Sequence, residues 1–486
     1  MNKELRRISI VVLIMFLALF GSSTIIQVFQ QGNLKTDPRN SRQYYASFNT
    51  QRGAILVDGQ PIAQSVPSND EYKYQRVYTN GPLYSAVTGY YTLNQGTTGI
   101  EAAENTDLSG NSGDQFFDRV NAIVTGQAPQ GASVSLTLDA KVQQAAYDAL
   151  GNYQGAVIAM DPKTGAILAM VSKPDFDPNA LAGHDTKQVV STYKQLLADP
   201  GDPLINRTIA GKLDPPGSTF KLVVASAALA DGLTPDTAFP NPPRYQLTGT
   251  NTFITNSEGG SCGGGDTATI KLALQLSCNI PFAELGQQLG YDKISDQAKA
   301  FGFGDTTITV PMPVTASVYP QTEDDAEQER SAFGQASDRV SPLQMAMVSS
   351  AIANGGVLMK PNLVQAITNP DLTSKQSFQP QEYGQSVSSD IAATMTQLMI
   401  NNVDNGAASN ARINGVQVAG KTGTAQNGDR NQLPYTLWFT GFAPADDPQV
   451  AVAVVVQNGG GIGHAGFGNT LAAPIAKKVM EAVLSR

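Results

Sequence analysis

An uncharged stretch near the N-terminus, residues 8–29, constrains the fold of this chain more than any other feature. As a helix that rises about 1.5 Å per residue, it is long enough to cross the roughly 30 Å hydrocarbon core of a membrane. Lys3, Arg6 and Arg7 precede it, and a basic flank usually stays in the cytoplasm. We therefore expect a short cytoplasmic segment (residues 1–7), a transmembrane anchor (residues 8–29) and folded, extracytoplasmic domains at the cell membrane.

A cleaved signal peptide is the competing interpretation of this stretch. Its apolar core would end near Phe20, but apolar residues continue through residues 25–29, and no convincing small-x-small cleavage site is present. We favour the uncleaved, single-pass anchor.

Charge and histidine content exclude several classes of protein. The 486 residues include 41 acidic and 32 basic ones, and no basic block follows the first seven residues, which argues against a nucleic-acid partner. The two histidines, His184 and His464, lie far apart in the sequence. They exclude a multi-histidine metal site but leave a serine–histidine–aspartate triad open. We expect no metal and no cofactor.

The two cysteines, Cys262 and Cys278, are too few for a zinc site and close in sequence. In an oxidising compartment they would form one disulfide that closes a short loop. Two free, buried thiols are the alternative.

A small first domain is expected over residues 30–135. It contains a short strand within residues 52–59 that the turn Asp58-Gly59 closes, and its remainder is rich in Tyr, Gly, Thr and Asn with little periodicity. This composition predicts a loop-rich α+β module.

At residue 136 the pattern changes to that of a larger α+β domain, residues 136–486. Asp139 can cap a helix that ends before Gly151, and two apolar runs joined by a turn predict a hairpin covered on both faces. A mostly helical stretch with two interruptions follows, and strands return only near the end. The hairpin runs are residues 155–160 and 166–171, the interruptions residues 258–265 and 323–325, the late strands residues 416–420, 435–443 and 450–457, and the final helix residues 470–484. Together they predict one sheet built from both ends of the domain, with helices against it.

A serine and a lysine lie one helical turn apart at the start of an apolar helix. Residues 215–221 read PPGSTFK, and residues 222–230 predict a buried helix that ends at residues 231–232. Ser218 and Lys221 then share one helix face. This is the arrangement in which a serine nucleophile uses a lysine as its base, although the same spacing also arises by chance.

Two further polar clusters belong to the same domain. Ser277 and Asn279 follow an apolar helix. The other cluster follows an apolar strand and consists of Lys421, Thr422, Gly423 and Thr424. A glycine there lets backbone approach a ligand closely. In the order Ser-x-x-Lys, Ser-x-Asn, Lys-Thr-Gly, the three clusters are the motif set of penicillin-recognising serine acyltransferases.

The chain therefore resembles a penicillin-binding protein. Residues 52–55 (RGAI) and 99–101 (GIE) look like parts of the pedestal, or dimerisation-like, domain of class B members, and the length and the cysteine pair beside Ser277 are most similar to the PbpA-type members. The resemblance implies the penicillin-binding transpeptidase fold, a central antiparallel sheet flanked by helices.

The resemblance also implies the activity. The protein would be a peptidoglycan D,D-transpeptidase that crosslinks stem peptides through an acyl-enzyme on Ser218, in growth or division, and that β-lactams inhibit. Lys221 would be the general base, with a pKa lowered by burial and by a nearby cation, and Ser277 would relay a proton to the leaving group. The substrate-binding residues would be Asn279, Lys421, Thr422, Gly423 and Thr424, and the N–H groups of Ser218 and Thr424 would form the oxyanion hole.

Three alternatives stay open: a D,D-carboxypeptidase, a β-lactamase-like hydrolase, and a penicillin-binding sensor or scaffold. A β-lactamase needs neither an anchor nor a pedestal, no glutamate motif of the class A deacylating kind follows Asn279, and residues 1–7 leave no room for a cytoplasmic output. No glycosyltransferase domain precedes Leu138. By resemblance, we expect a separate polytopic membrane glycan polymerase as partner.

Overall fold

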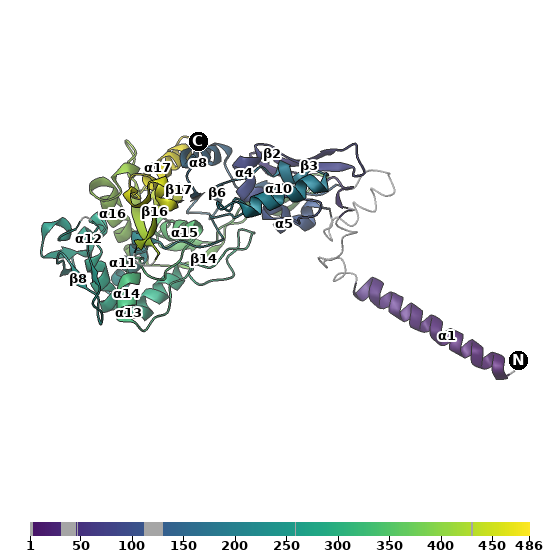
Figure 1. Ribbon diagram of the computed structural model, residues 1–486, viewed down its shortest axis with the longest axis horizontal. Helices are drawn as coiled ribbons and strands as arrows, with labels where there is room; N and C mark the ends of the chain where they lie inside the picture. The colour runs from purple at the N-terminus through teal and green to yellow at the C-terminus, as the bar shows by residue number, and fades with distance from the viewer. Residues whose placement is uncertain (1–2, 31–44, 46, 111–129, 258, 429–430) are drawn as a thin grey trace.

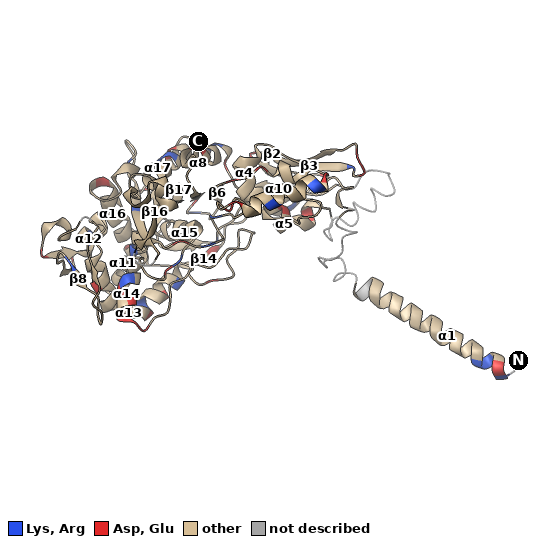
Figure 2. Cartoon of the chain, in the orientation of Figure 1, with Lys and Arg blue, Asp and Glu red and all other residues tan. Residues whose placement is uncertain are grey.

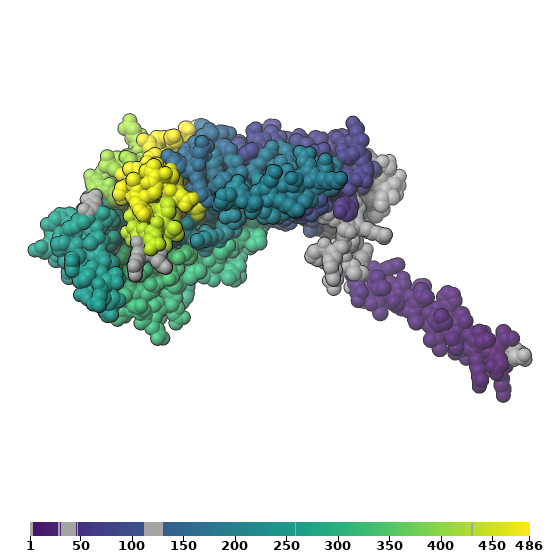
Figure 3. Space-filling view, in the orientation of Figure 1, coloured from purple at the N-terminus to yellow at the C-terminus, as the bar shows by residue number. Residues whose placement is uncertain are grey.

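The protein is described by a computed structural model that covers residues 3–30, 45, 47–110, 130–257, 259–428 and 431–486. One long helix extends away from the body of the molecule, and the body consists of an N-terminal and a C-terminal part (Figure 1). In the space-filling view the two parts form one elongated body (Figure 3).

The uncharged stretch forms the extended helix. Helix α1 (Lys3–Thr24) continues as a π-helical turn over Ile25–Phe29. The segment Lys3–Gln27 is long and apolar enough to cross a membrane, and none of its most apolar window is buried. Charged side chains lie only at its N-terminal end (Figure 2). The helix begins at Lys3, before the uncharged residues themselves.

The N-terminal part is built on a sheet with six strands among the described residues. The predicted Asp58-Gly59 turn joins the first two, and both residues have a positive φ, 49° and 74°, which Asp and Gly tolerate in tight turns. The strands are β1 (Ile55–Val57), β2 (Gln60–Pro67), β3 (Tyr74–Tyr78), β4 (Ser133–Leu136), β12 (Val364–Thr368) and β13 (Ser374–Ser377), in the order β13-β12-β4-β1-β2-β3. The helices are α4 (Gly81–Thr88), α5 (Gly99–Ala103) and α6 (Asn105–Leu108).

Two segments from beyond residue 136 pack on this N-terminal part. Strand β12 pairs antiparallel with β4 and places Val364 opposite Leu136. Helices α9 (Asn179–Ala182) and α10 (Thr186–Ala198) also lie against it, and the side-chain amide of Asn179 donates to the carbonyl of Tyr78 at 2.9 Å. These returns were not predicted from the sequence, and the domain division at residue 136 stays a prediction.

A buried ion cluster lies inside the N-terminal part. Glu101 on α5 accepts hydrogen bonds from the Nε groups of Arg52 and Arg76, both at 2.6 Å, and from the hydroxyl of Tyr78 at 3.2 Å. Burial opposes ionisation, but the two guanidinium groups outweigh it and lower the pKa of Glu101. The segments at residues 52–55 and 99–101 therefore meet in one cluster of charges.

The C-terminal part is built on a second, antiparallel sheet with five strands among the described residues. As predicted, it combines the early hairpin with late strands. The strands are β5 (Gly155–Met160), β6 (Ile167–Lys173), β15 (Ala419–Asn427), β16 (Leu433–Ala443) and β17 (Val450–Val456), in the order β15-β16-β17-β5-β6. Strand β15 lies at one edge of this sheet.

Helices cover both faces of the second sheet. Successive residues such as Val157 and Ile158 belong to different hydrophobic cores, because side chains alternate between the faces of a strand. Burial on both faces explains the continuous apolar runs of the hairpin. One core contains α8 (Ala140–Leu150) and α17 (Ala472–Leu484), and the other contains α11 (Lys221–Ala230) and α15 (Pro342–Ala353).

The middle of the domain differs from the expectation. The prediction that strands return only near the end is wrong, because short strands occur throughout residues 238–385, and pairs as short as β8 and β9 carry no alternation that a sequence pattern can reveal. Besides β12 and β13, these strands are β7 (Ala238–Pro240), β8 (Tyr245–Gln246), β9 (Phe253–Ile254), β10 (Thr267–Thr269), β11 (Val357–Met359) and β14 (Glu382–Gln385). The helices are α12 (Ile270–Leu276), α13 (Ile280–Ala300), α14 (Asp325–Ser331) and α16 (Ser389–Asn405). The acidic segment starts α14, since Asp324 caps its first turn.

Candidate active site

Ser218 lies where two elements meet. It belongs to a 3₁₀ turn, Gly217–Thr219, directly before α11, so the predicted position at a helix start is confirmed. Gly217 has a φ of +52°, and a Cβ on it would lie 3.0 Å from the backbone nitrogen of Ala425. Trp438 on β16 donates its indole N–H to the carbonyl of Pro215 at 2.9 Å. The serine segment is therefore held closely against β15 and β16.

Lys221, the first residue of α11, is fully buried. Its ammonium group donates to the carbonyls of Ser277 and Cys278, at 2.8 and 2.7 Å, and to Oδ1 of Asn279 at 2.9 Å. Burial, followed by the charge of Lys421, holds the pKa of Lys221 well below its usual value. The side chain is thus oriented by the Ser-x-Asn turn and suited to lose a proton.

Ser277 occupies the turn that ends α12. Its backbone is left-handed, with a φ of 64°, which is uncommon for a residue other than glycine and is a form of strain typical of functional sites. The hydroxyl of Ser277 accepts a hydrogen bond from Nζ of Lys421 at 2.7 Å. Asn279, at the start of α13, donates its side-chain amide to the carbonyl of Thr255 at 3.1 Å.

The Lys-Thr-Gly cluster lies within β15, so the expectation that it follows a strand at residues 416–420 is wrong. The strand was placed too early because its polar residues, which lie at the edge of the sheet, do not give the alternating apolar pattern that marks a strand in a sequence. Lys421 is fully buried, and burial lowers its pKa to about 7. A Cβ on Gly423 would lie 2.8 Å from the carbonyl oxygen of Pro216, so only glycine fits at this contact with the serine segment.

Most of the predicted site residues line one cavity of about 890 Å³. Ser218 borders it, and the two lysines lie buried behind its wall. The predicted residues that line it are Ser218, Ser277, Asn279, Thr422, Gly423 and Thr424. Sequence reasoning therefore identified residues from three distant segments that the fold brings together.

Several lining residues were not predicted. Phe253 and Phe467, each about half exposed, and Tyr435 add an aromatic border, and Gln335 and Asn469 add amides. The sequence did show Phe467 between two glycines, a pattern that could have drawn attention to it. The amides gave none, since their importance depends on backbone groups that are distant in sequence.

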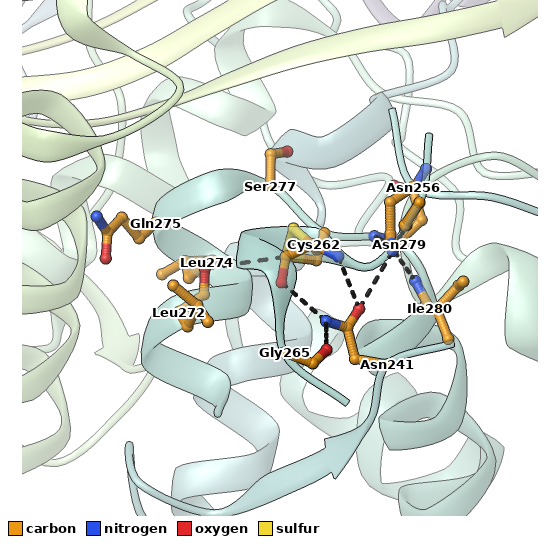
Figure 4. The surroundings of a disulfide bond; sticks show 12 residues. Asn241, Asn256, Cys262, Gly265, Leu272, Leu274, Gln275, Ser277, Asn279 and Ile280 are labelled. Carbon is orange, nitrogen blue, oxygen red and sulfur yellow. Dashed lines mark hydrogen bonds between the residues drawn. A yellow bond between two sulfur atoms is a disulfide. The ribbon is translucent and has the colours of Figure 1, made fainter. Parts of the chain in front are cut away.

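The predicted disulfide is present. Cys262 and Cys278 are bonded, with 5.8 Å between their Cα atoms, so the alternative of free thiols is wrong. Figure 4 shows the bond close to Ser277, below it in this view. Asn241 connects the same region, because its amide donates to the carbonyls of Cys262 and Gly265 at 2.8 and 2.9 Å. Bond and amide together fix residues 262–265 against the turn that carries Ser277 and Asn279.

Neither histidine lines the cavity. His184 pairs with Asp70 in the N-terminal part. His464 contacts the carbonyl of Leu433 at 2.9 Å and lies 4.8 Å from the Tyr435 ring, centre to centre. Among the described residues there is no cluster of three or more metal-binding side chains. A histidine triad is thus not assembled at Ser218.

The site can therefore carry out acyl transfer through a serine. Three segments beside a helix-flanked antiparallel sheet supply two hydroxyls and two buried amines of lowered pKa. The hydroxyls belong to Ser218 and Ser277, and the amines to Lys221 and Lys421. Fold and site define a serine acyltransferase of the penicillin-recognising class.

Known proteins agree with this class. Residues 155–481 match the penicillin-binding protein transpeptidase domain, and residues 52–134 match the penicillin-binding protein A dimerisation domain. The chain is 40% identical to peptidoglycan D,D-transpeptidase PbpA of Mycolicibacterium smegmatis and 38% identical to that of Mycobacterium tuberculosis, over 100% of this chain and 99% of each relative. A solved ceftriaxone acyl-enzyme complex of penicillin-binding protein A from M. tuberculosis superposes with a TM-score of 0.88 at 37% identity, covering 90% of this chain and 100% of that one. The chain belongs to the penicillin-binding proteins, in the group of PbpA-type transpeptidases.

The lowered pKa of Lys421 predicts a pH dependence. A lysine that titrates near pH 7 loses its positive charge as the pH rises, and with it the attraction for a ligand carboxylate. We expect the second-order rate of acylation by benzylpenicillin to fall as the pH rises through about 7. An arginine at this position keeps its charge at every accessible pH, so in Lys421→Arg the fall in the acylation rate should begin at a pH roughly two units higher or more. An unchanged decline in the arginine variant would contradict the assignment.

Proposed function

We propose that this protein is a peptidoglycan D,D-transpeptidase of cell-wall synthesis, acting in growth or division and inhibited by β-lactams. The observation that carries the proposal is the arrangement of Ser218, Ser277 and the Lys-Thr-Gly strand around one cavity, with Lys421 2.7 Å from the Ser277 hydroxyl. The names of the relatives support the same activity.

The first half of the reaction acylates the serine. Lys221 accepts the proton of Ser218 as the hydroxyl oxygen bonds to the carbonyl carbon of the penultimate D-Ala of a D-Ala-D-Ala donor. The N–H groups of Ser218 and Thr424 stabilise the oxyanion, and losing one such donor typically costs about 10²–10³ in rate. The peptide bond then breaks, Ser277 relays the proton held by Lys221 to the leaving nitrogen, and D-Ala departs.

The second half transfers the acyl group. An amine of a neighbouring stem peptide attacks the ester, and Ser218 recovers its proton as the crosslink forms. Lys421, Thr422 and Thr424 receive the donor's terminal carboxylate, Gly423 keeps that strand close to the serine, and Asn279 holds the donor backbone and orients Lys221. A β-lactam has no departing amine, so its acyl-enzyme persists.

The N-terminal helix supports a location at the cell membrane. With Lys3, Arg6 and Arg7 on the cytoplasmic side, α1 anchors the protein once in the cell membrane and the cavity faces the peptidoglycan. Glycan strands come from a separate polytopic membrane polymerase that contacts the anchor and the N-terminal part. Crosslinking in membranes, followed by identification of the captured proteins, should recover such a polymerase; its absence would contradict this partner.

Labelling with a fluorescent penicillin tests the activity. We expect one label per chain, on the peptide that contains Ser218, with release over hours. Release within seconds would favour a β-lactamase, and absence of labelling would contradict the proposal. A D-Ala-D-Ala donor supplied together with an amine acceptor should then give the crosslinked product. Hydrolysis alone would favour a carboxypeptidase, and binding without any turnover a sensor or scaffold.

A further inference from the structure

The outer edge of β15 carries an unusual side-chain contact. The amide of Gln335 donates through Nε2 to the carbonyl of Thr424 at 2.9 Å, and its Oε1 accepts from the backbone N–H of Gln426 at 3.0 Å. One primary amide therefore satisfies two backbone groups of an edge strand. One residue of a parallel neighbouring strand would make the same two contacts through its own N–H and C=O.

The backbone fixes the position of Gln335. Its N–H donates to the carbonyl of Arg330 at 3.0 Å, and its own carbonyl accepts from the guanidinium of Arg330 at 3.2 Å. The preceding residue, Gly334, accepts a hydrogen bond from the N–H of Gly217 at 3.0 Å. The amide is thus attached to the same backbone that positions Ser218.

An acyl donor needs the group that Gln335 contacts. Thr424 directs its carbonyl outward, and the N–H and C=O of one residue in an antiparallel strand point to the same side. A donor whose reacting carbonyl accepts from the Thr424 N–H therefore presents the N–H of the same residue to the Thr424 carbonyl.

We propose that Gln335 is a specificity-determining residue that competes with the donor's penultimate N–H for the carbonyl of Thr424. The inference rests on the proposed function, because it requires a donor that lies along β15 as Ser218 attacks it. A donor with this N–H gains a hydrogen bond to the Thr424 carbonyl, but it must first displace the hydrogen bond that Gln335 makes there. Gln335 therefore reduces the rate advantage of donors that have the N–H over donors that lack it.

Two matched thioester donors test the competition. One is N-benzoyl-D-alanyl thioglycolate, and the other replaces its amide N–H by an ester oxygen, so only the hydrogen-bond donor differs. The measured quantity is the ratio of kcat/KM for the amide over the ester. Gln335→Ala and Gln335→Met remove the competing amide, and we expect both to raise this ratio about three- to tenfold, the value of one ordinary hydrogen bond.

The ester donor serves as an internal reference, because any general disturbance of β15 lowers the rates of both donors and leaves their ratio unchanged. Gln335→Met keeps the length of the side chain, so it disturbs the cavity wall less than Gln335→Ala does. Ser337→Ala is the control on the same loop; its hydroxyl contacts Glu327 and not β15, and its ratio should equal that of the wild type.

The outcomes separate the two proposals. An unchanged ratio in both Gln335 variants would overturn the competition, and a lower ratio would show that Gln335 assists the amide donor instead. Turnover of either thioester that persists in Ser218→Ala would contradict the proposed function itself. Turnover that depends on Ser218, with a raised ratio, supports both.

Discussion

Ser218→Ala is expected to lose at least about 10⁴-fold in the rate of acylation by benzylpenicillin and in thioester turnover. Removal of a serine nucleophile leaves only binding and oxyanion stabilisation, which cannot form the covalent intermediate. The hydroxyl borders the cavity, and within the described part of the chain it takes part in no hydrogen bond, so its removal leaves no polar group unsatisfied. Stopped-flow fluorescence and intact-protein mass measure the loss.

Ser226→Ala is the matched control for this prediction. Ser226 is a buried serine on α11, the helix that follows Ser218, and its hydroxyl donates to the carbonyl of Leu222 at 2.8 Å, away from the cavity. This variant should keep rapid labelling, and both variants should keep the melting temperature within a few degrees. Labelling of Ser218→Ala at a rate near that of the wild type would place the nucleophile elsewhere.

Glu101→Gln is expected to give the largest loss of stability, about 3–5 kcal/mol in the free energy of unfolding. Glu101 compensates the charges of Arg52 and Arg76, and all three side chains are at most 2% exposed. A neutral amide of the same size would leave two buried guanidinium groups without their counter-ion. Chemical denaturation followed by circular dichroism measures the change.

An exposed ion pair provides the comparison. Lys163 and Asp447 also form a close contact, but their side chains are 53% and 71% exposed, and such pairs contribute little to stability. Asp447→Asn should leave the denaturation midpoint where it is. A similarly small effect of Glu101→Gln would mean that water or rearrangement compensates the two arginines.

The sequence predicted those elements whose signal is local. The hairpin runs at residues 155–160 and 166–171 carry no polar side chain because both faces of the hairpin are covered, and α8 has its aspartate cap and its terminal glycine. The three motif clusters identified the cavity because each combines rare residue types at fixed spacing. Their meeting in space followed from the resemblance and not from any pattern in the chain.

Features that depend on distant contacts were missed. Strand β15 was placed too early because its polar residues border the cavity instead of alternating. Gln335 gave no signal, since its role comes from the backbone of a strand some ninety residues later. Arg52 and Glu101 were each noticed within a motif, but their pairing and the second partner, Arg76, were not predicted, because a sequence pattern does not say which buried charges meet.

The pairing of β4 with β12 also has a consequence for the order of synthesis. The edge of β4 is completed by Val364–Thr368, which leaves the ribosome more than two hundred residues after Ser133–Leu136. Until then the first sheet has an open edge, the kind of surface that pairs with other chains. Contacts of such long range form slowly, and the N-terminal part cannot finish folding before most of the acylating part has emerged. A chain of this design must therefore be shielded from its neighbours while it is being made.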